Sequence, residues 1–586
     1  MRRREFVLTA GCTPLAAQPQ RPRPNVILIL TDDQGYGDLS AHGNPRLKTP
    51  NLDRLHSESV RFTDFHVTPM CTPTRSQLMS GRDALANSAM NVSSGRTMLR
   101  PDLPTMAGIF AASGYRTGIF GKWHLGDSYP YRPNDRGFQE ALWFPSSHIG
   151  SAGDAWDNDY FNDRYRHNGK LERYQGYCTD VFFGEATKWI RQGGQPFFAY
   201  IPLNAPHGPL FVDDRYRAAF RDLPRPLASF FGMIANIDEN AGRLEETLRA
   251  AGLRDNTILI FMTDNGGTAG VDFYNAGMRG RKIGLWEGGH RVPFFLRWPA
   301  GGFSRGRDIN ELTEVQDVLP TLIDLCGLKA PAGARFDGFS LAGLLRGQAG
   351  PPAGRLMVIQ FSRMNVGRPQ WGDACVLWKK WRLVSNTQLY DVASDPAQKQ
   401  DVAARNPEVV ARMRAHYEQW WKDVSPRLDT FLPVHIGASQ ENPTLVSPTE
   451  WADSFLDQGN QIRRGEPRNG VWHVLVEQDG EYTFTLRRWP QDIGVPMRAG
   501  LPAHDGEDGD YPAGVALPIA RARLVVGAAD LSKPVGPEDR EAVFTLRLGE
   551  GWTKMQTWFY DQQDREISGA YFVYVERKTP ARASAA

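Results

Sequence analysis

Cysteine is scarce in this chain of 586 residues, which contains only five. The cysteines are scattered along the sequence, at positions 12, 71, 178, 326 and 375. No two of them form a Cys-x-x-Cys pair, which argues against a zinc site or dithiol redox chemistry. Because the cysteines are so few and so far apart, a disulfide framework is not expected either.

Excess charge and long apolar runs are also missing. Lys and Arg number 68 against 66 Asp and Glu, so the formal net charge is +2. This balance gives no general attraction to nucleic acid, which is not expected as a partner, and any preference for an anion has to be local. No stretch beyond the N-terminal region is long enough to span a bilayer. The length predicts two or three domains.

The first residues have the pattern of an export signal. Arginines at positions 2–4 precede a short apolar stretch that runs to Ala17, and Arg-Arg followed by Phe-Val-Leu resembles a twin-arginine signal. Ala10-Gly11-Cys12 partly resembles a lipoprotein cleavage site, although Thr9 is not the usual large aliphatic residue. We predict a leader over residues 1–23 and an exported protein, periplasmic or at the cell surface. The alternative is a frayed cytoplasmic terminus.

Four apolar runs predict strands of one parallel sheet, at residues 25–30, 116–120, 195–203 and 257–263. Helical patterns lie between them, at 103–113, 178–191 and 229–251. Strands that alternate with helices indicate an α/β domain, whose ligands bind at the carboxyl ends of the strands. Each predicted strand is followed there by polar side chains, namely Asp32, Asp33, Lys122, His124, His207, Asp264 and Asn265.

Four of these side chains offer hard oxygen ligands. Asp32 and Asp33 follow one strand, and Asp264 and Asn265 follow another. Adjacent aspartates after a strand also commonly shape turns. Paired at two strand ends, with no cysteine or histidine among them, they favour a site for calcium or magnesium over one for zinc.

A second candidate for chemistry is the segment that begins at Cys71. Pro73 suits the first turn of a helix, so Cys71 is predicted at a helix N-terminus, where free N–H groups favour negative charge. Arg75 lies about one turn further and on the same face. This pattern predicts an anion site around a reactive sulfur. A buried cysteine beside a solvated arginine would have the same spacing.

The twelve residues Cys-Thr-Pro-Thr-Arg-Ser-Gln-Leu-Met-Ser-Gly-Arg, 71–82, closely resemble the defining motif of the sulfatase family. Asn-Ala-Pro-His-Gly-Pro at 204–209 and the stretch 280–293 resemble further motifs of that family. The resemblance covers about residues 24–425. It implies an α/β fold like that of alkaline phosphatase, with a large mixed, mainly parallel sheet flanked by helices and a small C-terminal subdomain of antiparallel sheet and helix.

The resemblance also implies the cofactors. Cys71 would be oxidised by a maturation enzyme to formylglycine (3-oxoalanine), whose hydrate attacks the sulfur of the ester. One Ca²⁺ would be bound by Asp32, Asp33, Asp264, Asn265 and the residue at position 71.

Roles for the remaining residues follow from the same resemblance. Arg75 would hold the oxygen of the hydrate, Lys122 the hydrate or the sulfate, and His124 would accept a proton from the hydrate. His207 would face the leaving oxygen. Lys282 would bind sulfate, with its neighbour Arg281 as a rival. A further serine near the site is not assigned, and Ser146 and Ser147 are candidates.

The predicted domains are a catalytic domain at 24–330, the small subdomain at 331–425 and an accessory β-sandwich at 426–586. Alternating residues at 470–477 and 480–487 predict a hairpin around Gln478-Asp479-Gly480. Strands at 522–526, 542–546 and 570–575 complete the sandwich, and residues 499–514 form a loop. The aromatic residues of the sandwich either bind sugar or pack internally.

The sequence therefore predicts an exported, calcium-dependent sulfatase that hydrolyses an aryl or carbohydrate sulfate to an alcohol and inorganic sulfate. Two alternatives stay open. One is a phosphonate monoester or phosphodiester hydrolase of the same superfamily. The other is a non-catalytic surface protein that binds sulfated glycans. Oligomeric state is not predicted.

Overall fold

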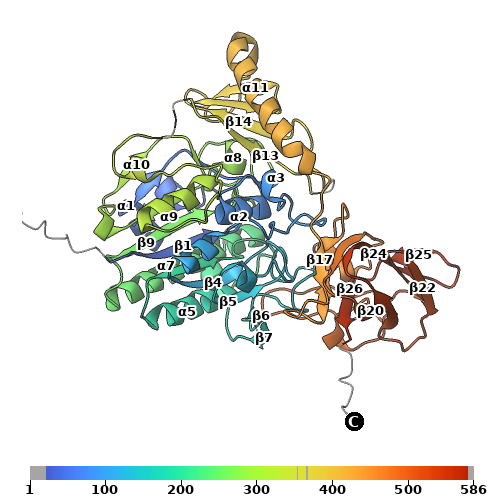
Figure 1. Ribbon diagram of the computed structural model, residues 1–586. Coiled ribbons are helices and arrows are strands. Elements are labelled where there is room, and N and C mark those ends of the chain that lie inside the picture. The colour runs from blue at the N-terminus through green and yellow to red at the C-terminus, as the bar shows by residue number, and fades with distance from the viewer. Residues whose placement is uncertain (1–21, 351, 353, 365–366, 579–586) are drawn as a thin grey trace, which may run out of the picture.

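The computed structural model describes residues 22–350, 352, 354–364 and 367–578 (Figure 1). Most of the predicted leader lies outside this part of the chain. A ten-stranded sheet forms the centre of the largest unit. Its middle strands run parallel in the order β9 (Thr257–Thr263), β1 (Asn25–Thr31), β8 (Phe197–Pro202), β4 (Arg116–Lys122) and β5 (Glu140–Phe144). The four predicted strands are confirmed as members of this parallel group.

Shorter strands extend the sheet at both edges and make it mixed. On one side β10 (Phe294–Arg297) runs antiparallel to β9 and is followed by β2 (Val60–Phe62) and β11 (Arg307–Ile309). On the other side β6 (Arg164–His167) and β7 (Lys170–Arg173) continue from β5 as antiparallel strands. The predicted large, mixed and mainly parallel sheet is therefore confirmed.

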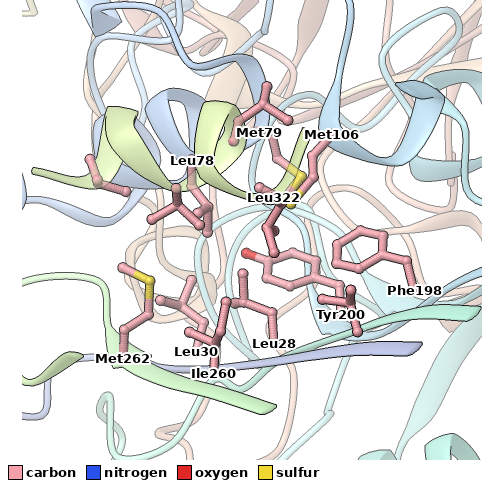
Figure 2. Packing of buried hydrophobic residues seen from close by; sticks show 14 of the residues in the cluster. Leu28, Leu30, Leu78, Met79, Met106, Phe198, Tyr200, Ile260, Met262 and Leu322 are labelled. Atoms are coloured by element: carbon pink, nitrogen blue, oxygen red, sulfur yellow. The ribbon is translucent and has the colours of Figure 1, made fainter. Parts of the chain in front are cut away.

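Helices cover both faces of this sheet (Figure 1). Alternate residues of β1 pack on opposite faces of the sheet, because successive side chains of a strand point in opposite directions. Leu28 and Leu30 pack in one apolar cluster with α2 (Cys71–Ser80), α4 (Met106–Ala112) and α9 (Val318–Cys326). Figure 2 shows these strand residues beneath Leu78 of α2 and Leu322 of α9. This packing against β1 fixes the position of the first residues of α2 relative to the carboxyl ends of the strands.

The opposite face has a core of its own. Ile27 and Ile29 of β1 pack there with residues of α1 (Pro50–Ser57), α5 (Cys178–Arg191) and α7 (Arg225–Ala250). The predicted helix at 178–191 coincides with α5, whereas the helix predicted at 229–251 begins four residues earlier, at Arg225. No helix in the described part of the chain has the length and apolar character that crossing a membrane requires.

The remaining elements of this unit are short. They comprise the helices α3 (Ala84–Asn87), α6 (Asp214–Arg217), α8 (Glu287–His290) and α10 (Ala342–Leu345), and the paired strands β3 (Phe65–His66) and β12 (Thr313–Glu314). Leu341, Ala342 and Leu345 pack in the same apolar cluster as Leu28. The chain therefore stays against the large sheet until α10 and only then crosses to the next unit.

That next unit is a four-stranded antiparallel sheet, β13 (Met357–Gln360), β14 (Ala374–Trp378), β15 (Trp381–Val384) and β16 (Gln388–Asp391), packed against α11 (Pro407–Val424). It lies at the top of Figure 1. Arg382 of β15 is fully buried and donates to Glu287 of α8 at 2.7 Å and to Asp64 at 2.9 Å. Although burial favours the neutral carboxyl, this guanidinium holds the pKa of Glu287 at about 2. A buried ion-pair network therefore joins the two units.

The C-terminal region is β-rich, with two sheets around one apolar core. One sheet contains β17 (Val434–Ile436), β19 (Trp472–Val476), β24 (Gly551–Tyr560), β21 (Arg521–Val526) and β22 (Ala529–Pro534), with β25 (Glu566–Ser568) beside β24. The other contains β18 (Thr444–Val446), β26 (Phe572–Arg577), β20 (Gly480–Arg487) and β23 (Ala542–Leu548), and a short helix, α12 (Gly459–Arg463), precedes β19.

The predicted hairpin between residues 470–477 and 480–487 is wrong. Both strands exist, but β19 pairs with β17 and β24, whereas β20 pairs with β23 and β26. The segment between them passes from one sheet to the other, so Trp472 and Val474 share a core with Tyr482 and Phe484. Alternating side chains with a turn between them suit a hairpin and a crossing between sheets equally well, which is why the local pattern did not distinguish them.

Candidate active site

Cys71 is the first residue of α2, with Met70 extended before it and Pro73 in the first turn. The whole helix is buried, and Cys71 is 2% exposed. Its Sγ lies 3.5 Å from Asp32 Oδ1 and 3.5 Å from Lys282 Nζ. Burial, with the negative charge of Asp32, raises the pKa of the thiol to about 12. Without a bound metal ion beside it, a thiol with so high a pKa is protonated at neutral pH, and a protonated thiol is a poor nucleophile.

The four predicted oxygen ligands come together beside Cys71. β1 and β9 are parallel neighbours in register from Asn25 to Thr31, so the residues that follow them meet at one edge of the sheet. Asn265 Nδ2 donates to Asp33 Oδ1 at 2.8 Å, and the backbone N–H of Asp33 contacts Asp264 Oδ1 at 3.3 Å. Asp33 has a φ of +67°, a left-handed conformation that Asp tolerates better than most residues.

This arrangement fits a divalent metal ion. The Oδ1 atom of Asn265 is buried and has no hydrogen-bond partner among the described residues. One ligand atom from each of Asp32, Asp33, Cys71 and His207 lies within 4.8 Å of the others. Burial and the charge of Asp32 raise the pKa of Asp264 to about 6. A cation held among such oxygen donors would offset the cost of these buried carboxylates, and oxygen donors suit Ca²⁺ or Mg²⁺.

Arg75 and Lys122 bring positive charge to the same carboxylates. Both side chains are fully buried. The guanidinium of Arg75 donates to Asp264 Oδ2 at 2.8 and 3.0 Å and to Asp32 Oδ2 at 3.2 Å, and the ammonium of Lys122 also contacts Asp32. Although burial favours the neutral acid, the charges of Lys122 and Arg75 hold the pKa of Asp32 well below its usual value.

Both neighbouring candidates, Arg281 and Lys282, line the pocket, but Lys282 is the one that contacts Cys71 and Asp33. The Nζ atom of Lys282 lies 2.5 Å from Asp33 Oδ1, and this partner raises the pKa of the ammonium well above its usual value although burial opposes it. The Arg281 side chain is 48% exposed and pairs with the exposed Asp272. The structure therefore places the Lys282 cation, and not that of Arg281, against the thiol of Cys71.

Two histidines offer unprotonated nitrogens to the site. His124 Nε2 contacts the carbonyl of Val92 at 2.9 Å and therefore carries the proton, so that the buried Nδ1, which has no partner among the described residues, is an acceptor. In His207, Nδ1 contacts the carbonyl of Gly208 at 2.6 Å, which leaves Nε2 as the acceptor, 3.8 Å from Asp33 Oδ2. Burial lowers the pKa of both rings, helped by the charge of Lys122 at His124 and of Lys282 at His207.

These groups line a cavity of about 600 Å³. Cys71, His124, His207 and Lys282 contribute to its wall, together with Ser147. Parts of the chain far from the motifs also line it, namely Met364, which follows β13, and Phe455, Asp457 and Gln458 from the C-terminal region. The pocket is therefore built by all three units of the structure.

Two titratable residues of the pocket were missed by the sequence analysis, His148 and Asp457. Both are buried, and the His148 ring stacks on that of His207 with centroids 5.2 Å apart. Ser147 Oγ donates to Asp457 Oδ2 at 2.6 Å, and Ser146 Oγ lies 3.4 Å from the other carboxylate oxygen. His148 directly follows the candidate serines, which is a weak signal. Asp457 is more than 300 residues from its serine partners and has no motif around it.

Comparison with known proteins shows which family this chain is similar to. The family described as Sulfatase matches residues 24–328, just over half of the chain. Rat N-acetylgalactosamine-6-sulfatase is 29% identical over 361 residues, an alignment that covers 56% of this chain and 66%, or about two thirds, of the rat protein. Human arylsulfatase G is 30% identical, with 58% of this chain and 71% of that protein covered. The solved structure of Ps i-CgsB in complex with k-i-k-neocarrahexaose is 27% identical with a TM-score of 0.62, and the match covers 68% of this chain and 92% of that one.

Proposed function

Because this chain belongs to the sulfatase family, we propose that it hydrolyses a sulfate ester to an alcohol or phenol and inorganic sulfate. The observation that carries the proposal is the position of Cys71. Its side chain lies at the start of a buried helix, within 3.5 Å of Lys282 Nζ, and lines a pocket that also contains His124 and His207. A sulfate group in this pocket would meet positive charge and the N–H groups of a helix N-terminus.

We propose that Cys71 acts after oxidation to formylglycine by a maturation enzyme. The burial of the free thiol and its raised pKa support this, since a protonated thiol at the centre of the site would be a poor nucleophile. When formed, the hydrated aldehyde would supply two oxygens on one carbon, one to attack sulfur and one to release sulfate afterwards. Arg75 and Lys122, both buried beside Asp32, would fix the position and charge of this group.

We propose Ca²⁺ as the metal, held by Asp32, Asp33, Asp264, Asn265 and the residue at position 71. The unpaired Oδ1 of Asn265 and the all-oxygen character of the strand-end residues support this choice. When bound, the ion would draw electron density from the sulfate oxygens and orient the nucleophile.

Three further side chains would move or hold protons and charge. His124 Nδ1 is an acceptor and would take a proton from the hydrate. Lys282 would neutralise charge on the non-bridging oxygens of sulfate as it develops in the transition state. His207 lines the same pocket and would face the leaving oxygen, but its Nε2 could donate a proton there only when the ring is protonated at both nitrogens, which the lowered pKa opposes. The charge that supports departure of the leaving oxygen would therefore come from Lys282.

The substrate we propose is a carbohydrate or aryl sulfate, in line with the names of the relatives. Steady-state kinetics test the function: kcat/KM for 4-nitrophenyl sulfate should exceed that for an aryl phosphonate monoester, and Cys71→Ala should abolish both activities. A higher kcat/KM for the phosphonate would name the other hydrolase class. If wild type turned over no sulfate ester while Cys71→Ala still retained sulfated glycans on an affinity column, the binding-protein alternative would hold.

We also propose that the protein is exported by the leader at residues 1–23, with residues 24–330, 331–425 and 426–586 as its domains. The arginines that precede a short apolar stretch support the leader. Fractionation of the producing cells tests it. Activity in the periplasmic or cell-surface fraction is expected, and activity confined to the cytoplasm would contradict it.

A further inference from the structure

The wall of the pocket formed by Ser147, His148 and Asp457 differs in chemistry from the sulfate-binding side. That side is rich in cations and includes Lys282. The other side carries a buried carboxylate, Asp457, that no cation contacts directly within the described residues. Two hydrogen bonds also fix the backbone of Asp457. Its N–H donates to Gln461 Oε1 at 2.9 Å, and its carbonyl accepts from the N–H of Ala152 at 2.8 Å.

The hydrogen bonds of this wall fix which atoms are free to receive a ligand. Ser147 Oγ has one proton, and the 2.6 Å contact with Asp457 Oδ2 uses it when Asp457 is ionised. The 2.7 Å contact between Ser147 Oγ and His148 Nδ1 then requires the proton of His148 Nδ1. His148 Nε2 is left as an acceptor. Asp457 Oδ1 has only the long 3.4 Å contact with Ser146, so it also retains acceptor capacity.

We propose that Asp457 and His148 form a specificity wall that accepts hydrogen bonds from free hydroxyl groups of the leaving group. The substrate class is then a sugar sulfate whose hydroxyls next to the ester carry no sulfate. This inference rests on the proposed sulfatase function and deepens it. An additional sulfate or carboxylate near the ester would meet the Asp457 carboxylate, and two anions in a buried site repel each other.

The test compares substrates with and without hydroxyls in wild type and Asp457→Asn. The probes are galactose 6-sulfate, N-acetylgalactosamine 6-sulfate and 4-nitrophenyl sulfate, which has no hydroxyl. Loss of a hydrogen bond to a charged group should lower the ratio of kcat/KM on the preferred sugar sulfate to kcat/KM on the aryl sulfate by about ten- to a hundredfold. The same variant should raise the relative turnover of N-acetylgalactosamine 4,6-disulfate, in which the ring hydroxyl nearest the 6-ester carries a second sulfate, because it removes the opposing charge.

Asp492→Asn is the matched control, since Asp492 lies in the same C-terminal region but pairs with Arg164 at the surface. Should Asp457→Asn fold poorly, inhibition of aryl sulfate hydrolysis by each sugar sulfate in wild type gives a second measurement. Tighter inhibition by the monosulfated than by the disulfated sugar is expected. An unchanged ratio in Asp457→Asn, or a wild type that hydrolyses aryl but no sugar sulfates, overturns the specificity wall alone. A wild type inactive on every sulfate ester overturns the proposed function.

Discussion

Replacing Lys282 with Met tests whether this cation, and not its neighbour Arg281, supports the reaction. The Lys282 ammonium lies 2.5 Å from Asp33 and 3.5 Å from Cys71 Sγ, and its side chain is only 14% exposed. A preorganised donor aimed at charge that develops in the transition state contributes about a hundred- to a thousandfold in kcat. Lys282→Met should therefore lower kcat/KM for 4-nitrophenyl sulfate by about that factor.

Arg281→Met is the matched change one residue away. Its side chain is 48% exposed and pairs with Asp272, which is 79% exposed, and such surface pairs contribute about 0.2–1 kcal/mol. Arg281 also lines the pocket, but its guanidinium pairs with Asp272 and not with Asp33 or Cys71, so we expect a loss in kcat/KM of less than about fivefold for this variant. Thermal unfolding of both variants separates loss of fold from loss of chemistry. A similar loss in the two folded variants, or a loss of less than about tenfold for Lys282→Met, would refute the role given to Lys282.

Three further predictions concern the metal and the stability of the fold. Chelation of the metal should abolish activity, and added Ca²⁺ should restore activity and raise the unfolding temperature. In Asn265→Leu, which lacks one oxygen ligand, added Ca²⁺ should neither restore activity nor raise the unfolding temperature. Activity that survives exhaustive chelation would contradict this prediction. Arg382→Met should destabilise the protein by about 3–5 kcal/mol in urea unfolding, because the buried carboxylate of Glu287 loses its hydrogen-bonded partner and keeps only a 3.6 Å ion pair with Arg291. A loss of less than about 1 kcal/mol would refute that reasoning. Burial, with the charge of Asp127, raises the pKa of Glu450 from 4.5 to about 8, so the folded state binds this proton more tightly than the unfolded state. The protonated Glu450 side chain contributes its full stability below pH 4.5, and this contribution is lost as the pH rises to about 8. The stability of Glu450→Gln, whose side chain does not titrate, should therefore rise relative to that of wild type across this window. A difference in stability between the two proteins that does not change with pH would count against this prediction.

The sequence predicted the central sheet and the positions of the polar side chains well, for a physical reason. Parallel strands buried on both faces are continuous apolar runs, and their carboxyl ends lie at one edge. Asp32 after β1 and Asp264 after β9 are brought together by strand register alone. Pro73 and the polar residues around Cys71 likewise marked the start of α2.

What could not be predicted depends on contacts between distant parts of the chain. The pairing of β19 and β20 in different sheets is decided by packing across a shared core, which local alternation does not encode. Asp457 reaches the pocket because its segment docks against Ala152 and Ser147. No short motif records such a contact, so the sequence located the reactive end of the pocket but not the wall opposite it.

The central claim is that the residue at position 71 reacts as an oxidised side chain beside a divalent ion. Mass spectrometry of the tryptic peptide Phe62–Arg75, taken from protein purified in active form from its native host, tests this claim most directly. We predict an aldehyde, or its hydrate, in place of the thiol. An intact thiol at position 71 in fully active protein would contradict it.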